Sequence, residues 1–145
     1  MIRKILRRVL GRTLFGNLLR VINYITLPKA IKREASVQAI IDRATKDLSL
    51  YQFVTCPFCI KVTRFMHTNA INIELRDAQR DSHYKSDLIT FGGKQQVPCL
   101  RVAQKERTDI WLYESDEIIK YLKKNKLKSL HKNNYLKYYY HFFWD

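Results

Sequence analysis

Cys56 and Cys59 form the motif in this chain whose residue types and spacing favour covalent chemistry. They directly follow an apolar run, Leu48 to Val54, which alternates as a buried strand does. The spacing of the next apolar residues predicts a helix over 57–68, with Pro57 in its first turn, where the missing N–H costs nothing. Free N–H groups and the positive end of the helix dipole favour a thiolate at the helix start. We therefore predict that Cys56 is a nucleophile and that Cys59, one turn deeper, is the resolving thiol.

Other readings of the cysteines are half of a zinc site or two thiols of a core. Zinc needs four ligands, and the chain offers only Cys99 and four histidines, without a second paired spacing, so no metal site is predicted. Cys99 lies in an apolar stretch and is expected to be a buried core thiol. Three cysteines do not make the even framework of a small secreted domain, which favours a reducing compartment and a cytoplasmic location.

The elements that must position the cysteines are predicted from the residues that follow them. A second strand is expected over 72–76, and a helix that ends at Phe91 comes next. The chain then enters a strand through Pro98, which cannot donate to a strand ladder. This position suggests a cis bond that leaves neighbouring backbone groups free for a ligand, and an ordinary strand-initiating proline is the alternative.

A hairpin and a helix complete this region. The hairpin is predicted around residues 105–106, and its second strand over 110–113. Acidic residues then open a helix that ends in basic residues at Asn125, as the helix dipole favours.

Together these features resemble the glutaredoxins, specifically the branch that is similar to the N-terminal domain of glutathione transferases. The resemblance covers about residues 48–125 and rests on Cys-Pro-Phe-Cys after a strand, Val-Pro about 40 residues further on, and YESDEIIKYL after a hairpin. It implies an α/β, thioredoxin-like fold (βαβ-ββα, with a mixed four-stranded sheet), here with an N-terminal amphipathic helical extension. It also implies glutathione as the co-substrate.

The resemblance implies a role for each residue near the cysteines. Cys56 would attack or carry the glutathione mixed disulfide, and Cys59 would resolve it. Phe58 would line the groove, and Lys61 would add positive charge near the thiolate.

It also implies which residues would hold glutathione. Val97 would pair its backbone with the cysteinyl unit, beside a cis Pro98, and Glu114 and Ser115 would hold the γ-glutamyl end. A simple helix cap is the alternative for Glu114 and Ser115.

The function expected from these features is glutathione-dependent thiol-disulfide oxidoreduction of disulfide-containing or glutathionylated proteins. The alternative from another class is a non-catalytic adaptor of the same fold, which binds glutathione or docks to a membrane. An iron-sulfur carrier is a third candidate, although that role in the family usually goes with CGFS and a single active cysteine.

The N-terminal segment is strongly basic. Residues 1–33 hold nine basic residues and no acidic one, in a chain of net charge +14. The apolar residues of this segment have helical spacing, but charged residues interrupt every stretch that could cross a bilayer. The apolar set from Leu14 onward lies on nearly the reverse side from the earlier one, which predicts two amphipathic pieces hinged between Gly11 and Gly16.

Apolar surface combined with cations predicts that residues 1–33 contact an anionic membrane surface, giving the protein a peripheral position there. The alternatives are packing on the protein's own domain or on a second copy, and a mitochondrial presequence. Nucleic acid is not a predicted partner, because aromatic interleaving and a recognition motif are both lacking.

The length of 145 residues fits one domain with flanking segments. A connecting helix is expected over 34–47, the domain over 48–125 and a tail over 126–145. The tail holds seven of the chain's eighteen aromatic residues, so it is expected to pack over the domain or to lie at a membrane interface.

Overall fold

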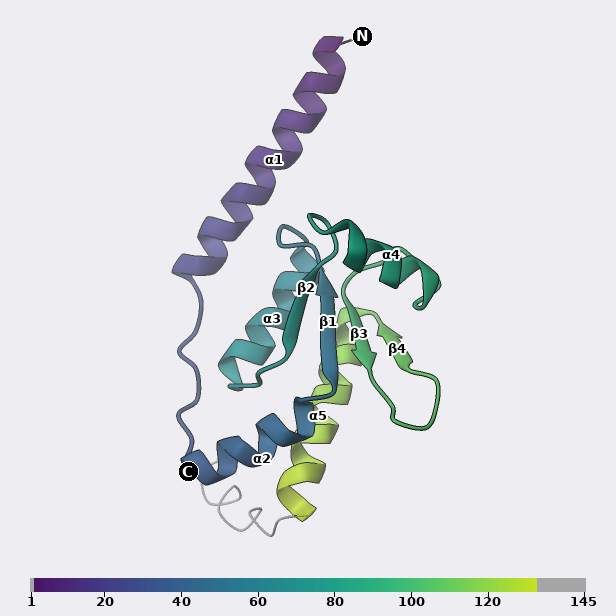
Figure 1. Cartoon of the computed structure of the whole chain (residues 1–145). Helices are drawn as coiled ribbons and strands as arrows, with labels where there is room; N and C mark the ends of the chain where they lie inside the picture. The colour runs from purple at the N-terminus through teal and green to yellow at the C-terminus, as the bar shows by residue number, and fades with distance from the viewer. Residues whose placement is uncertain (1, 133–145) are drawn as a thin grey trace.

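The computed structural model describes the backbone of residues 2–132 and the side chains of residues 14–125 and 128–130. A four-stranded sheet with the order β2-β1-β3-β4 lies at its centre (Figure 1). The strands are β1 Leu48–Gln52, β2 Glu74–Asp77, β3 Cys99–Val102 and β4 Ile110–Tyr113. β1 and β2 are parallel, whereas β3 is antiparallel to both β1 and β4. This mixed sheet confirms the predicted α/β, thioredoxin-like architecture.

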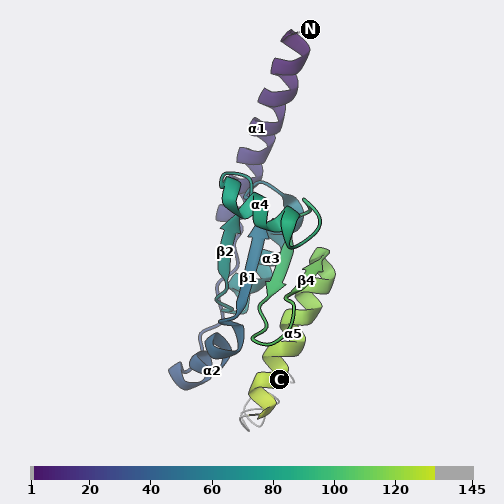
Figure 2. The same cartoon turned by 45° about the vertical axis from the view of Figure 1, so that its right-hand side comes forward.

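The described part of the chain also contains helices α1 Ile2–Ile25, α2 Ala35–Thr45, α3 Pro57–Thr68, α4 Ser82–Thr90 and α5 Ser115–Lys132. The core consists of two apolar clusters, one on each face of the sheet. β1 contributes to both, because successive side chains of a strand point to opposite faces. Leu50 packs with Val62 of α3 and Ile118 of α5 in the larger cluster. Tyr51 packs with Leu88 of α4 in the smaller one. Figure 2 shows these layers from a second side.

Strand and helix limits follow the predictions closely around the cysteines. α3 covers the predicted residues 57–68, and β4 covers the predicted residues 110–113. β1 ends at Gln52 rather than Val54, because a turn begins there, with the Cys56 N–H donating to the Phe53 carbonyl at 3.0 Å. β2 begins two residues later than expected.

The predicted end of the last helix at Asn125 is wrong, because α5 continues to Lys132. No glycine or proline interrupts the chain between these residues. Leu130 is fully buried in the same cluster as Ile41 of α2, so the added turns complete the core. Of the tail predicted over 126–145, residues 126–132 belong to α5, and the rest, which holds its seven aromatic residues, lies outside the described residues.

The predicted hinge between Gly11 and Gly16 is also wrong, because α1 is one uninterrupted helix. Glycine lowers helix stability by about 1 kcal/mol relative to alanine, which a long helix tolerates. The irregular segment 27–34 follows α1 and is tied to the end of α3, where the Ile31 N–H donates to the Thr68 carbonyl at 3.0 Å. None of the described helices is long and apolar enough to span a membrane.

Candidate active site

The start of α3 presents one thiol and buries the other. Cys56 is the N-cap residue of α3, with extended backbone (φ −80°, ψ 124°), and its carbonyl accepts from the Ile60 N–H at 2.9 Å. The Cys56 side chain is half-buried, whereas Cys59, one turn further on, is 1% exposed. Neither cysteine is in a disulfide. An approaching disulfide therefore meets Cys56 before Cys59.

The environment of Cys59 holds it in the thiol form at neutral pH. The pKa of Cys59 is raised to about 12, mainly by burial; a hydrogen bond with the Phe53 backbone lowers it, and the charge of Cys56 and a hydrogen bond with Cys56 also raise it. Cys56, in contrast, lies beside the unpaired N–H groups of the first turn of α3, which stabilise negative charge. The two thiols are thus chemically unequal.

The register of the sheet brings the Val97-Pro98 segment to the same end of the sheet as Cys56. Tyr51 of β1 and Tyr113 of β4 both pair with Cys99 of β3. Pro98 precedes Cys99, so it lies between the chain that leaves β1 toward Cys56 and the chain that leaves β4. The Val97-Pro98 peptide is cis, as predicted, and Pro98 is buried.

Glu114 lies beside this proline segment. Its Oε1 accepts a hydrogen bond from Gln96 Nε2 at 2.7 Å, and its backbone has a positive φ of 65°. Non-glycine residues seldom adopt such a conformation, which is often found at functional sites. The Glu114 carboxylate is exposed, while Ser115, the first residue of α5, is 5% exposed. Gln96 had not been assigned a role from the sequence, because a polar loop residue has no pattern that distinguishes it.

The remaining predicted site residues lie on the outer surface of α3. The ring of Phe58 is 61% exposed beside Cys56. Lys61 Nζ forms an ion pair with Asp116 Oδ1 at 2.5 Å, which links α3 to the first turn of α5. Such an exposed pair contributes only about 0.2–1 kcal/mol to stability. The positive charge of Lys61 is therefore partly neutralised by Asp116.

Helix α1 also contacts this site; packing on the protein's own domain was an alternative for residues 1–33 in the sequence analysis, but the contact with this site was not predicted. Gly16 is buried, and a Cβ atom placed on it would lie 2.9 Å from both Cβ and Cγ2 of Thr55, the residue before Cys56. A cavity of about 600 Å³ lies next to this contact and is lined from both sides, among others by Asn17 and Arg20 of α1 and by Val54 and Ile60. The signal in the sequence was the glycine inside an otherwise apolar helix, since a helical glycine often marks close packing.

Cys99 does not join the other two cysteines. It is fully buried, as predicted, and its pKa is raised to about 11 because burial outweighs the lowering effect of a hydrogen bond with Tyr113. The Tyr113 hydroxyl donates to the Gly92 carbonyl at 2.6 Å. Within the part of the chain that the structure describes, no group of three or more His, Cys, Asp or Glu side chains could hold a metal ion.

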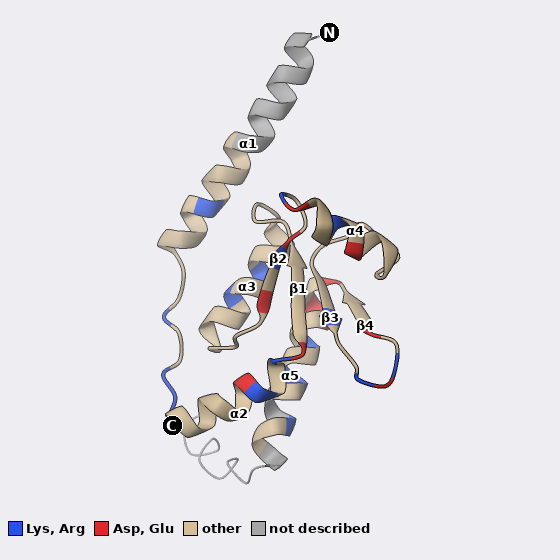
Figure 3. Cartoon of the chain, viewed as in Figure 1, with Lys and Arg blue, Asp and Glu red and all other residues tan. Residues whose placement is uncertain are grey.

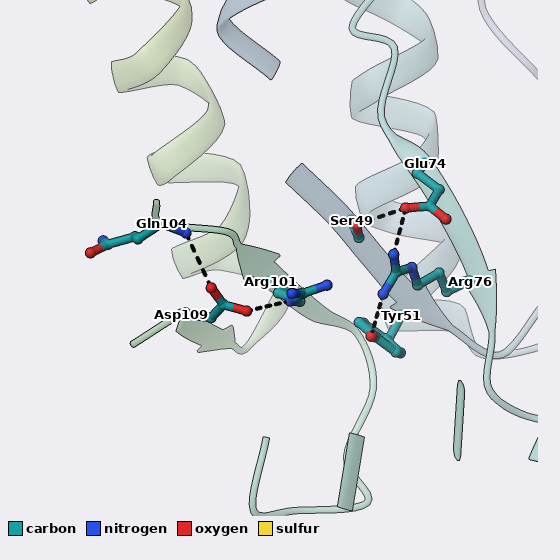
Figure 4. A network of polar contacts seen from close by, with 7 residues as sticks. All are labelled: Ser49, Tyr51, Glu74, Arg76, Arg101, Gln104 and Asp109. Carbon is teal, nitrogen blue, oxygen red and sulfur yellow. Dashed lines mark hydrogen bonds and ion pairs between the residues drawn. The ribbon is translucent and has the colours of Figure 1, made fainter. Parts of the chain in front are cut away.

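Charged side chains cross-link the strands on the α4 side of the sheet (Figure 4). Arg76 Nη2 donates to Glu74 at 2.8 Å, and its Nη1 donates to the Tyr51 hydroxyl at 2.6 Å. The hydrogen bond from Arg76 holds the pKa of Glu74 below its ordinary value. A separate ion pair joins Arg101 to Asp109 at 2.6 Å. These contacts hold together the strands whose ends carry the site residues.

Comparison with known proteins agrees with this arrangement. The model of the family described as glutaredoxin matches residues 48–106. No curated protein and no solved structure matches the chain significantly. The matched region contains Cys56, Cys59 and Pro98 but ends before Glu114.

Proposed function

Residues 48–106 are a glutaredoxin domain, and on this premise we propose that the chain is a glutathione-dependent thiol-disulfide oxidoreductase. Its substrates are disulfide-containing or glutathionylated proteins, and it acts in a reducing compartment, the cytoplasm. The observation that carries the proposal is the inequality of the two thiols. Cys56 lies at the start of a helix and is accessible, whereas Cys59 is buried with a pKa raised to about 12.

The reaction begins at Cys56. Its thiolate attacks the glutathione sulfur of a mixed disulfide, the substrate's S–S bond breaks, and the substrate leaves as a thiolate that takes up a proton. Glutathione is now joined to Cys56. The thiolate of a second glutathione attacks its sulfur, releasing oxidised glutathione and restoring the Cys56 thiolate. The net reaction converts the mixed disulfide and one free glutathione to the reduced substrate and one molecule of oxidised glutathione.

Cys59 serves the reduction of a disulfide within a protein. Attack of Cys56 joins the enzyme to the substrate, and Cys59 then displaces the substrate thiol by forming a disulfide with Cys56. Cys59 must lose its proton to do so. Burial is the main cause of the raised pKa of Cys59, and the charge of Cys56, a smaller cause, is lost once Cys56 has formed the mixed disulfide.

The glutathione tripeptide would bind across the end of the sheet. The backbone of Val97 would pair with the cysteinyl unit, and Glu114 with Ser115 would hold the γ-glutamyl end. Support comes from the register, in which Pro98 lies between the chain that leaves β1 toward Cys56 and the end of β4, where Glu114 follows. The Glu114 carboxylate is exposed and held by Gln96, so it can accept from the ammonium group of the γ-glutamyl end.

Glutathione-dependent reduction of a small glutathione mixed disulfide tests the proposal. Wild type should be active, Cys56→Ser inactive, and Cys59→Ser partly active, because glutathione can resolve the mixed disulfide without a second thiol. Equal loss in both variants would indicate a purely dithiol mechanism. An inactive wild type that still binds glutathione would instead favour the non-catalytic adaptor.

A further inference from the structure

Helix α1 turns its apolar side away from the domain. The exposed side chains are Leu14, Leu18, Val21, Ile22 and Ile25, each 46% to 75% exposed. At about 100° per residue these five lie within an arc of about 100°, which is the width of the apolar face that an amphipathic helix normally buries. Val21, at one edge of this arc, also lines the cavity between α1 and the domain, so Leu14, Leu18, Ile22 and Ile25 form the exposed apolar face of α1.

The opposite side of α1 holds the helix on the domain. Gly16 lies against Thr55, as described above. Arg64 of α3 donates from Nη1 to Oδ1 of Asn23 at 2.9 Å and from Nη2 to the Thr26 carbonyl at 2.7 Å. Gly16 and Asn23 lie roughly opposite the centre of the apolar arc. The side of the helix that carries Gly16 and Asn23 is therefore the packed side, and the exposed apolar face remains for another partner.

The charges around this face indicate the partner. Residues 1–33 hold nine Lys and Arg and no acidic residue, and in the described part of this segment only Lys and Arg carry charge (Figure 3). An apolar helix face in a segment with a net positive charge is typical of a helix that lies in the headgroup region of an anionic membrane. We propose that the apolar face of α1 docks the protein on an anionic lipid surface and thereby holds Cys56 beside that surface.

The position of Cys56 follows from the Gly16–Thr55 contact. Thr55 touches the side of α1 that faces away from the lipid, and a helix with its side chains is about 10 Å across. The turn that carries Cys56 thus lies about one helix diameter above the apolar face. Disulfides held at the membrane surface are then the favoured substrate class, which rests on the proposed reactivity of Cys56.

The experiment uses the full chain with two matched double variants. Leu18→Gln with Ile25→Gln changes the apolar face of α1, whereas Ile89→Gln with Ile110→Gln changes two apolar residues of the domain that are also exposed, by 46% and 43%. Sedimentation with vesicles of phosphatidylglycerol and phosphatidylcholine should show binding of wild type and of the domain variant. The α1 variant should bind at least about tenfold more weakly. Salt should weaken the wild-type binding, and vesicles of phosphatidylcholine alone should bind less.

A second measurement tests where Cys56 lies. The Cys56 thiolate attacks a pyridyl disulfide, forms a mixed disulfide with the probe and releases pyridine-2-thiol, which can be followed by absorbance. With the probe attached to a lipid headgroup in anionic vesicles, wild type should react faster than the α1 variant. With a soluble pyridyl disulfide, both should react at the same rate.

Two results would overturn the proposal. Wild type that reacts with the soluble probe but stays in the supernatant with anionic vesicles at low salt shows that lipid is not the partner, while the proposed oxidoreductase function stands. A wild type that is dimeric by sedimentation, with an α1 variant that is monomeric, assigns the apolar face to a second copy. If neither chain reacts with the soluble probe, the proposed function fails instead.

Discussion

Gln96 Nε2 donates a hydrogen bond of 2.7 Å to Oε1 of Glu114, and Glu114 has a positive φ of 65°. Replacing Glu114 by glycine should relieve the backbone strain and raise the free energy of unfolding by about 1 kcal/mol. The same change removes the carboxylate proposed to bind the γ-glutamyl end, so the KM for glutathione should rise. Urea unfolding and glutathione-dependent kinetics measure the two effects.

The control is Glu114→Gln, which keeps the strained backbone and loses the charge. It should raise the KM for glutathione without raising stability. A Glu114→Gly protein with the wild-type KM would show that Glu114 only begins α5.

The three cysteines should differ in reactivity toward iodoacetamide in the native protein at pH 7.5. Cys56 is accessible, whereas Cys59 and Cys99 are 1% and 0% exposed, with pKa values raised to about 12 and about 11. Because the thiolate is the reactive form, both should react at least about a hundredfold more slowly than Cys56. Mass spectrometry of peptides at successive times identifies the order, and urea should make all three reactive. Rapid labelling of Cys59 would contradict the proposed inequality of the thiols.

The contact between Gly16 and Thr55 should be measurable as a coupling energy. Gly16→Ala places a Cβ atom 2.9 Å from the Thr55 side chain and should lower stability, although alanine favours a helix. In a Thr55→Gly protein the same change should become neutral or stabilising. A double-mutant cycle by urea unfolding should give a coupling of about 1 kcal/mol, and additive effects would show that α1 does not pack there.

Stability should fall at alkaline pH in a way that depends on Cys99. The pKa of Cys99 is raised from 9.0 to about 11 by burial, so between these values the folded protein binds more protons than the unfolded chain. The stabilisation is therefore complete below about pH 9 and is lost as pH rises toward 11. From pH 7.5 to 10, wild type should lose about 1 kcal/mol more than Cys99→Ala. Equal losses would show that Cys99 is not buried as described.

Local sequence patterns predicted the elements around the cysteines well. Pro57 and the apolar spacing located α3, and Pro98 indicated both the start of β3 and the cis peptide. These features depend on backbone restrictions of individual residues, which a sequence displays directly. The position of Cys56 at the start of α3 was predicted from Pro57 in the same way.

Features that depend on packing between distant segments were not predictable in the same way. The continuation of α5 to Leu130 depends on its burial with Ile41 of α2. The packing of α1 on the domain depends on Gly16 meeting Thr55, a contact between residues 39 positions apart. Periodicity correctly grouped the apolar residues of α1, but it could not tell that the polar side would face the domain.

The most direct test of the account is the product of Cys59→Ser with oxidised glutathione, measured by mass spectrometry of the intact protein and its peptides. Without Cys59 to resolve it, the mixed disulfide should accumulate, with one glutathione on Cys56 and none on Cys99. A protein that remains unmodified, or that carries glutathione on Cys99 instead, would contradict the claim that Cys56 is the nucleophile of a glutathione-dependent oxidoreductase.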